Sequence, residues 1–137
     1  PINYNKEDFH EAVMDLTNGK GVPVVYDSVG KTTFSKSLDC LRPRGVMALF
    51  GQSSGPVPKF DPGLLAAKGS LFLTRPSLMA YNGTRRELEA SANALFDVVA
   101  SGAVKVKVNQ TYPLKDAVRA HKDLEGRKTT GSTVFRV

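Results

Sequence analysis

The chain has 137 residues, which fits a single domain, and its 41% hydrophobic and 23% charged content is that of an ordinary soluble globular protein. No stretch approaches the ~18 consecutive apolar residues that a membrane span requires, and no apolar targeting segment follows Pro1. The net charge of +6 comes from scattered basic residues, such as the separate pairs Arg42 with Arg44 and Arg127 with Lys128, which argues against a clustered nucleic-acid-binding surface.

The first part of the chain alternates between helix and strand patterns. Apolar spacing predicts a helix over residues 5–16, begun by a capping asparagine. Residues 22–29 are nearly continuously apolar, which predicts a strand buried on both faces. A short helix over 32–41, a turn at 42–45 and a second buried strand at 46–50 are expected next. This order predicts a parallel sheet with right-handed crossovers.

The middle of the chain begins with a loop over 51–61 that is rich in Ser, Gly and Pro. A small helix at 62–68 and a third strand at 70–74 are expected after it. Thr84 and Glu87 then form the sequence pattern of a capping box. The apolar spacing behind this box predicts a long amphipathic helix.

The last part of the chain returns to short elements. Valines alternate with lysines over 104–108, which predicts a strand with one face in water. A helix over 114–125 and a final strand over 133–137 complete the predicted order.

The sequence contains no glycine-rich phosphate-binding motif. No G-x-G-x-x-G is present. Gly30, Lys31 and Thr32 are similar to the end of a P-loop, but that motif requires glycine where this chain has Val25. Gly30 is therefore expected only to end its strand.

Metal and nucleophilic chemistry also lack support. Cys40, His10 and His121 are too far apart in the sequence to form a zinc site by spacing. Ser53 and Ser54 do not form the G-x-S-x-G pattern of a nucleophile elbow. As the only cysteine, Cys40 excludes an internal disulfide and favours a reducing, cytoplasmic location.

Three predicted strand ends remain as candidates for a ligand site. Residues 27–30, 50–55 and 74–76 supply short hydroxyls, small glycines, an aromatic ring and a guanidinium group. Ligands of open parallel sheets bind beyond the carboxyl ends of the strands, and this mixture suits a large polar ligand with a flat ring. The alternative is that these glycines only form turns, and the residues alone do not favour either interpretation.

Several segments of the chain resemble one known family essentially from end to end. They include Val24–Gly30, Ser37–Gly45, Phe50–Pro56, Lys68–Pro76 and Tyr112–Ser132. Together they resemble the zinc-free NADPH:quinone oxidoreductases, which include the zeta-crystallin-like proteins and belong to the medium-chain dehydrogenase/reductases. The chain is similar to the C-terminal portion of such an enzyme.

The resemblance implies an α/β fold in two parts. Residues 1–77 would be the C-terminal half of an NAD(P)-binding Rossmann domain, a partial doubly wound parallel sheet. Residues 78–137 would be the returning C-terminal piece of a GroES-like catalytic domain.

The resemblance also implies positions for the cofactor and the substrate. Tyr4 would lie near the adenosine 2′-phosphate of NADPH, and Ser28 would line the nucleotide site. The residues that would border the nicotinamide are Phe50, Gly51 and Ser53. Arg127 would reach the cofactor from the C-terminal segment, with Thr74 and Arg75 as weaker candidates at the quinone mouth. No catalytic residue and no metal ligand are implied.

The implied activity is hydride transfer from NADPH to a quinone by a cytoplasmic, zinc-free enzyme. We expect this portion alone to be inactive, because the glycine-rich turn that binds the pyrophosphate is absent from it. We also expect a homo-oligomer, such as a dimer, joined through the 70–74 strand, and no membrane partner. The alternatives are a basic module that binds single-stranded nucleic acid, which the scattered charges disfavour, and a structural or dimerisation fragment without activity.

Overall fold

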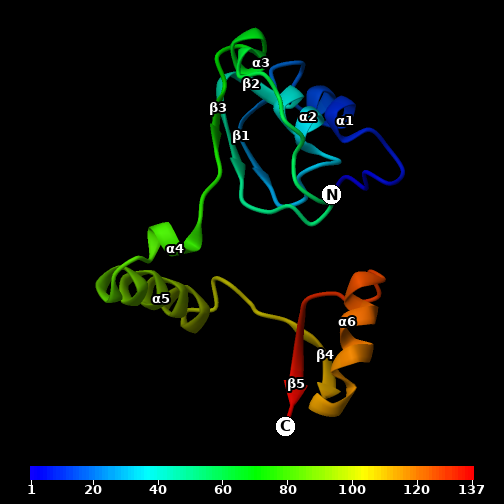
Figure 1. Cartoon of the computed structure of the whole chain (residues 1–137), viewed down its shortest axis with the longest axis vertical. Helices are drawn as coiled ribbons and strands as arrows, with labels where there is room; N and C mark the ends of the chain where they lie inside the picture. Colours follow the sequence, from blue (N-terminus) through cyan, green and yellow to red (C-terminus); the bar gives the residue numbers. More distant parts are fainter. The chain divides into compact units, whose positions relative to one another are not determined.

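The computed structural model describes all 137 residues. They form two compact units, Pro1–Tyr81 and Asn82–Val137 (Figure 1). The first unit contains a three-stranded sheet and the second a two-stranded sheet, and all strand pairs are parallel. The predicted α/β class with parallel strands is therefore confirmed.

The first unit is built on a sheet with the strand order β1-β2-β3. Its elements, in chain order, are α1 (Phe9–Leu16), β1 (Val22–Asp27), α2 (Phe34–Asp39), β2 (Leu41–Leu49), α3 (Gly63–Ala67), β3 (Phe72–Thr74) and α4 (Leu78–Tyr81). Asp27, the last residue of β1, lies opposite Leu49 at the end of β2, and Ala48 lies opposite Thr74 at the end of β3. The carboxyl ends of the three strands therefore meet at one edge of the sheet.

A small hydrophobic core joins helix α2 to the sheet. Its members come from α2, β2 and the residue before β3, and they are Phe34, Leu38, Leu41, Met47, Leu49 and Leu71. Met47 on the central strand is fully buried, and Leu38 on α2 is 1% exposed. The predicted second strand is thus buried as expected, because it has a neighbour on both sides.

The prediction that the first strand is buried on both faces is wrong. Val24 is 39% exposed and Tyr26 is 75% exposed. Strand β1 has a partner only along β2, so it forms an edge of this sheet. Apolar composition indicated burial, but the position of the strand in the sheet determines its exposure.

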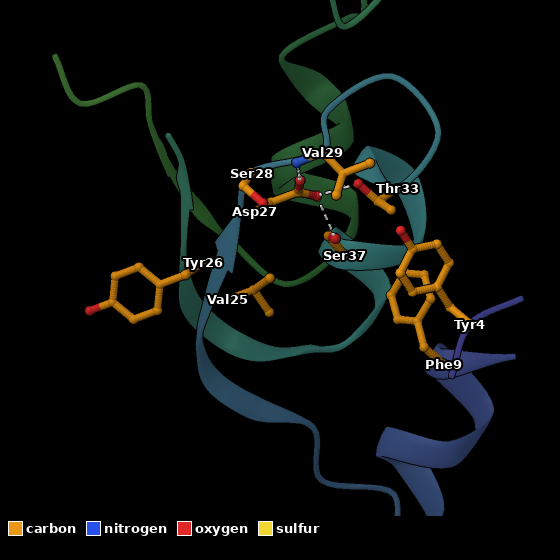
Figure 2. A pocket seen from close by; sticks show the side chains of 9 residues that line it. All are labelled: Tyr4, Phe9, Val25, Tyr26, Asp27, Ser28, Val29, Thr33 and Ser37. Atoms are coloured by element: carbon orange, nitrogen blue, oxygen red, sulfur yellow. Dashed lines mark hydrogen bonds between the residues drawn. The ribbon is translucent and has the colours of Figure 1, made fainter. Parts of the chain in front are cut away.

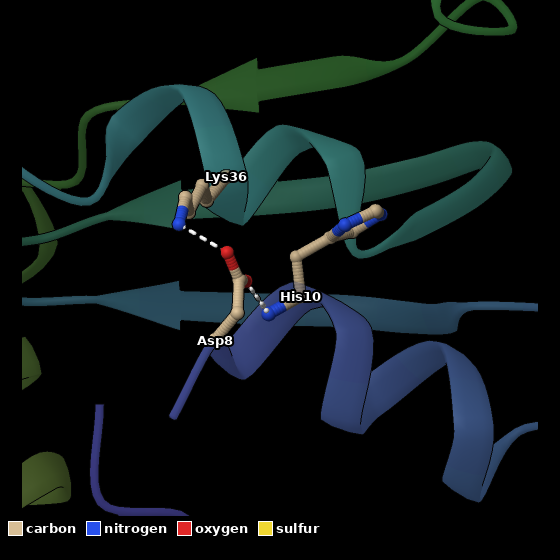
Figure 3. A network of polar contacts seen from close by, with 3 residues as sticks. All are labelled: Asp8, His10 and Lys36. Carbon is tan, nitrogen blue, oxygen red and sulfur yellow. Dashed lines mark hydrogen bonds and ion pairs between the residues drawn. The ribbon is translucent and has the colours of Figure 1, made fainter. Parts of the chain in front are cut away.

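Helix α1 begins at Phe9 and not at residue 5. Asp8 takes the cap position, with φ −76° and ψ 113°, and its Oδ1 accepts a hydrogen bond of 2.9 Å from the amide of His10. Its other oxygen, Oδ2, pairs with the ammonium group of Lys36 on α2 (Figure 3). The cap and the ion pair together place the first turn of α1 beside α2.

Residues 42–45 were predicted as a turn, and they form an irregular section of β2. Val22 pairs with Leu41, but Val24 pairs with Val46, so β2 contains extra residues between the two pairs. Arg44 adopts a left-handed conformation, with φ 60°, and its amide donates to the carbonyl of Gly69 at 2.8 Å. The backbone therefore turns within residues 42–45 as predicted. The strand, however, begins before this turn and not after it.

The second unit contains the remaining elements. They are α5 (Arg85–Ala100), β4 (Val108–Pro113), the 3-10 helix η1 (Leu114–Asp116), α6 (Ala117–Glu125) and β5 (Ser132–Arg136). The capping box predicted for Thr84 and Glu87 is present in both directions at the start of α5. Strands β4 and β5 pair in parallel, and helix α6 lies between them in the chain. No helix of the whole chain combines the length and apolar character needed to cross a membrane.

The strand predicted at 104–108 is wrong, because β4 begins only at Val108. The amide of Val104, which follows α5, donates to the carbonyl of Val98 near the end of that helix at 3.0 Å, so this residue is bonded to the helix and not to a strand. Val106 is 62% exposed and lies outside any sheet. The alternation of valines and lysines therefore predicted a strand at residues that have no neighbouring strand to pair with.

Candidate functional site

The ends of β1 and β2 are joined by backbone hydrogen bonds. The amides of Phe50 and Gly51 donate to the carbonyl of Asp27 at 2.9 and 3.2 Å. The amide of Ser53 donates to the carbonyl of Ser28 at 3.2 Å. The loop after β2 is therefore held against the turn after β1.

The end of β3 is fixed to the same edge by a side chain. Nη1 of Arg75 donates to the carbonyl of Leu49, the last residue of β2, at 3.0 Å. Arg75 is itself exposed, and its guanidinium group forms no ion pair within the chain. The three strand ends singled out in the sequence are thus brought together at one edge.

Two glycines permit this close approach of backbones. A Cβ atom on Gly51 would lie 2.3 Å from the carbonyl oxygen of Ser28, far inside any normal contact. Gly30 has φ +86°, and a Cβ there would lie 2.9 Å from the carbonyl oxygen of Gly55. Only glycine at these positions lets the two loops form their hydrogen bonds.

The carboxylate of Asp27 lies at the centre of this edge and is 4% exposed. Its Oδ1 accepts hydrogen bonds from the amides of Val29 and Gly30 at 2.7 and 2.9 Å. Its Oδ2 accepts from the hydroxyls of Thr33 and Ser37, both at 2.7 Å (Figure 2). One side chain thereby fixes the end of β1, the turn after it and the start of α2.

Burial by itself would raise the pKa of Asp27. The hydrogen bonds from Gly30, Thr33, Ser37 and Val29 together outweigh burial and hold the pKa below its usual value of 3.8. The group is therefore an anion at neutral pH, and all four of its donors stabilise the charged form.

A groove beside this network is lined by Tyr4, Phe9, Val25, Tyr26, Asp27, Ser28, Val29, Thr33 and Ser37. The rings of Tyr4 and Phe9 form an edge-to-face pair, with centroids 6.3 Å apart (Figure 2). Val25 projects from β1 towards this groove, and Tyr26 projects from the opposite side of the strand (Figure 2). The groove has a volume of about 230 Å³, below the ~300 Å³ of the smallest usual ligand pockets, so it suits one part of a larger ligand.

The structure brings several of the predicted site residues together. Tyr4 and Ser28 line the groove, and Gly51 and Ser53 bond to the backbone beside it. Phe50 is 52% exposed in the loop that begins with these bonds.

Besides Phe50, Gly51 and Ser53, three further predicted residues lie outside the groove lining. Thr74 is the exposed last residue of β3, and Arg75 follows it. Arg127 belongs to the second unit, where it is exposed directly after α6 in a left-handed conformation with φ 55°. Its amide donates to the carbonyl of Leu124 at 3.0 Å.

The sequence reasoning missed the network around Asp27. It named residues 27–30 as a strand end but assigned no role to Asp27, Thr33 or Ser37. A usable signal was present, because a carboxylate that ends an apolar strand and precedes small or hydroxyl-bearing residues often accepts hydrogen bonds from the following turn.

The potential metal ligands of the chain are dispersed, and its single thiol is buried. No group of three or more His, Cys, Asp or Glu side chains is arranged to hold a metal ion. Cys40 is 3% exposed, and burial, with the nearby charges of Asp39 and Asp8, raises its pKa to about 11. The thiol is therefore protonated at neutral pH and behaves as a small apolar side chain.

The parallel sheet with a groove at the carboxyl ends of its strands defines a Rossmann-like α/β protein of the dinucleotide-binding type. Residues 1–135 match the family model described as zinc-binding dehydrogenase, and the chain belongs to this family. The membership predicted from the sequence is confirmed. The zinc in the family's description has no ligand set among these residues.

Similar proteins are named as oxidoreductases. The chain is 54% identical over 136 residues to quinone oxidoreductase 1 of Escherichia coli, covering 98% of this chain and 42% of that protein. It is 48% identical over 137 residues to a 2-haloacrylate reductase of a Burkholderia species, covering 98% of this chain and 40% of the relative. The crystal structure of an Escherichia coli quinone oxidoreductase complexed with NADPH matches with a TM-score of 0.94 at 53% identity, covering 99% of this chain and 42% of that one. The chain thus spans about two fifths of the length of these relatives.

The charge of Asp27 predicts how stability depends on pH. Its pKa in the folded chain lies below the usual 3.8, so its stabilising effect is fully present above that usual value. The effect is lost as the pH falls through the lowered folded pKa, because protonation removes an acceptor from the network. Asp27→Asn has no such titration, so its deficit in unfolding free energy relative to the wild type should shrink below about pH 4. Urea unfolding of both chains from about pH 6 to about pH 2 measures this deficit, and a constant deficit would contradict the prediction.

Proposed function

We propose that this chain forms part of an NADPH-dependent oxidoreductase that transfers hydride to a quinone. The observation that carries the proposal is the groove at the carboxyl edge of the sheet, in a chain 53% identical to a quinone oxidoreductase whose crystal structure contains NADPH. The relatives' names do not favour the alternative of a nucleic-acid-binding module. We also propose a cytoplasmic location, which a free, buried Cys40 suits, and zinc-free catalysis, which the resemblance to the zinc-free family implies.

Each part of the chain has its own role in the proposed enzyme. Residues 1–77 supply the second half of the cofactor domain, and residues 78–137 supply the last piece of the catalytic domain. NADPH, when bound, provides the hydride that reduces the quinone together with one proton. The chain's own residues bind and orient the reactants and exclude water from them.

The resemblance implies the two sides of the cofactor site, and the groove supports this because both Tyr4 and Ser28 line it. Ser28 would contact the nucleoside, and Tyr4 would lie near the 2′-phosphate. The nicotinamide end would be bordered by Phe50, Gly51 and Ser53, with Thr74 and Arg75 at the quinone mouth and Arg127 reaching the cofactor. Arg75 suits its place because Leu49 fixes one end of its guanidinium group and leaves the other donors free.

The same geometry predicts that the 137-residue chain binds NADPH weakly. It contains no glycine-rich turn for the pyrophosphate, and the amides of Val29 and Gly30 already bond to Asp27. We expect a dissociation constant above about 10 µM in a titration of NADPH fluorescence. The Escherichia coli relative is the positive control, and sub-micromolar binding by this chain would contradict the prediction.

We further propose a homodimer joined through β3. This strand is the second edge of the sheet, and Phe72 on it is 61% exposed, so unpaired backbone groups and apolar surface lie together. Pairing of β3 with β3 of a second copy would cover both.

Light scattering at a chain concentration of about 10 µM tests this dimer. A dimer with a micromolar dissociation constant is populated at that concentration. The wild type should have twice the monomer mass, and Phe72→Lys should shift the chain towards the monomer. Leu16→Lys is the matched control, because Leu16 is 76% exposed on α1 and away from the sheet edge. A monomeric wild type would refute the proposal.

A further inference from the structure

Four hydrogen-bond donors of the turn between β1 and α2 converge on one group, the carboxylate of Asp27. In dinucleotide-binding folds, backbone amides in a strand–turn–helix connection bind phosphate oxygens. Here the amides of Val29 and Gly30 bond to Oδ1 of Asp27 at 2.7 and 2.9 Å. The hydroxyls of Thr33 and Ser37, which are 8% and 4% exposed, bond to Oδ2 at 2.7 Å. Two oxygens of one carboxylate thus receive four donors, as two oxygens of a bound phosphate would.

The charge of this carboxylate is not neutralised by any cation. None of the chain's five ion pairs includes Asp27. The groove beside it is lined by aromatic, aliphatic, hydroxyl and carboxylate side chains, without Lys, Arg or His. An anionic group entering the groove would meet an uncompensated negative charge and find the amides of Val29 and Gly30 already bonded to it.

We propose that Asp27 is a built-in anion that fills the donor site of the β1–α2 turn and makes the adjoining groove select an uncharged part of its ligand over a phosphate. That uncharged part is a nucleoside, a choice that rests on the proposed NADPH function. The exclusion of phosphate rests on the network alone.

The direction of the hydrogen bonds from Thr33 and Ser37 also favours an uncharged ligand group over a phosphate. Thr33 and Ser37 each have one hydroxyl proton, and both protons point to Asp27. What remains on these oxygens is acceptor capacity, which suits the hydroxyl or amino donors of a ribose or a base. Tyr4 is 47% exposed at the groove and adds an aromatic surface for such an uncharged group.

Asp27→Ala tests the proposal by freeing the four donors. In this variant inorganic phosphate should shift the NMR signals of the Val29 and Gly30 amides in a saturable way. Saturating phosphate should also raise the Tm by about 5 °C more than it raises that of the wild type. In the wild type the two amide signals should not respond to phosphate. In Asp27→Asn the Val29 and Gly30 amide signals should respond less to phosphate than in Asp27→Ala, because the amide oxygen of asparagine still accepts from both backbone amides.

Asp8→Ala is the matched control. Asp8 also accepts a backbone amide hydrogen bond, from His10, but it is paired with a lysine (Figure 3) and is not part of the groove lining. Its removal reports the general stabilising effect of phosphate salts. If Asp27→Ala is unfolded in chloride buffer, the measurement becomes recovery of the folded state on adding phosphate. Recovery no greater than that of Asp8→Ala, or wild-type Val29 and Gly30 signals that move with phosphate, would overturn the proposal.

A parallel titration with adenosine separates this inference from the proposed function. Binding of adenosine by the wild type, with shifts at Ser28 and Tyr4, supports the nucleoside assignment. If adenosine does not bind but Asp27→Ala gains phosphate binding, the role of Asp27 stands and the nucleoside assignment fails.

Discussion

The buried carboxylate of Asp27 links the secondary structure of the first unit to its candidate site. Its backbone carbonyl accepts the amides of Phe50 and Gly51, while its side chain accepts two amides and two hydroxyls from the turn and from α2. The same residue therefore sets where β1 ends, how α2 begins and how closely the loop after β2 approaches. Burying a charge is costly unless it is fully hydrogen-bonded, and here four donors meet that condition.

The rest of the first unit supports this arrangement. Leu38 and Met47 hold α2 against the central strand, and the loops pack closely because Gly51 has no side chain to meet Ser28. Both edge strands, β1 and β3, remain open to further pairing. The unit thus combines a hydrogen-bonded strand-end site with two exposed sheet edges.

Sequence reasoning predicted the order of most elements, because local signals determine them. The capping box at Thr84 and the apolar stretch of β2 are such signals. Exposure of Tyr26 and the true position of β4 depended on which strands pair, and that information is not local. The candidate site was predicted in position, since strand ends of a parallel sheet meet at one edge. Its central residue was missed because the partners of Asp27 lie up to 10 residues away and only the fold brings them together.

Amide hydrogen exchange at Val29 and Gly30 tests the central role of the Asp27 carboxylate most directly. Both amides bond to its Oδ1, whereas the amide of Gln52, an exposed residue in the neighbouring loop, forms no hydrogen bond within the chain. The account predicts that Val29 and Gly30 exchange at least about 100-fold more slowly than Gln52 near neutral pH, because their bonds open only with the network. Exchange of all three amides at similar rates would show that the carboxylate does not hold the turn.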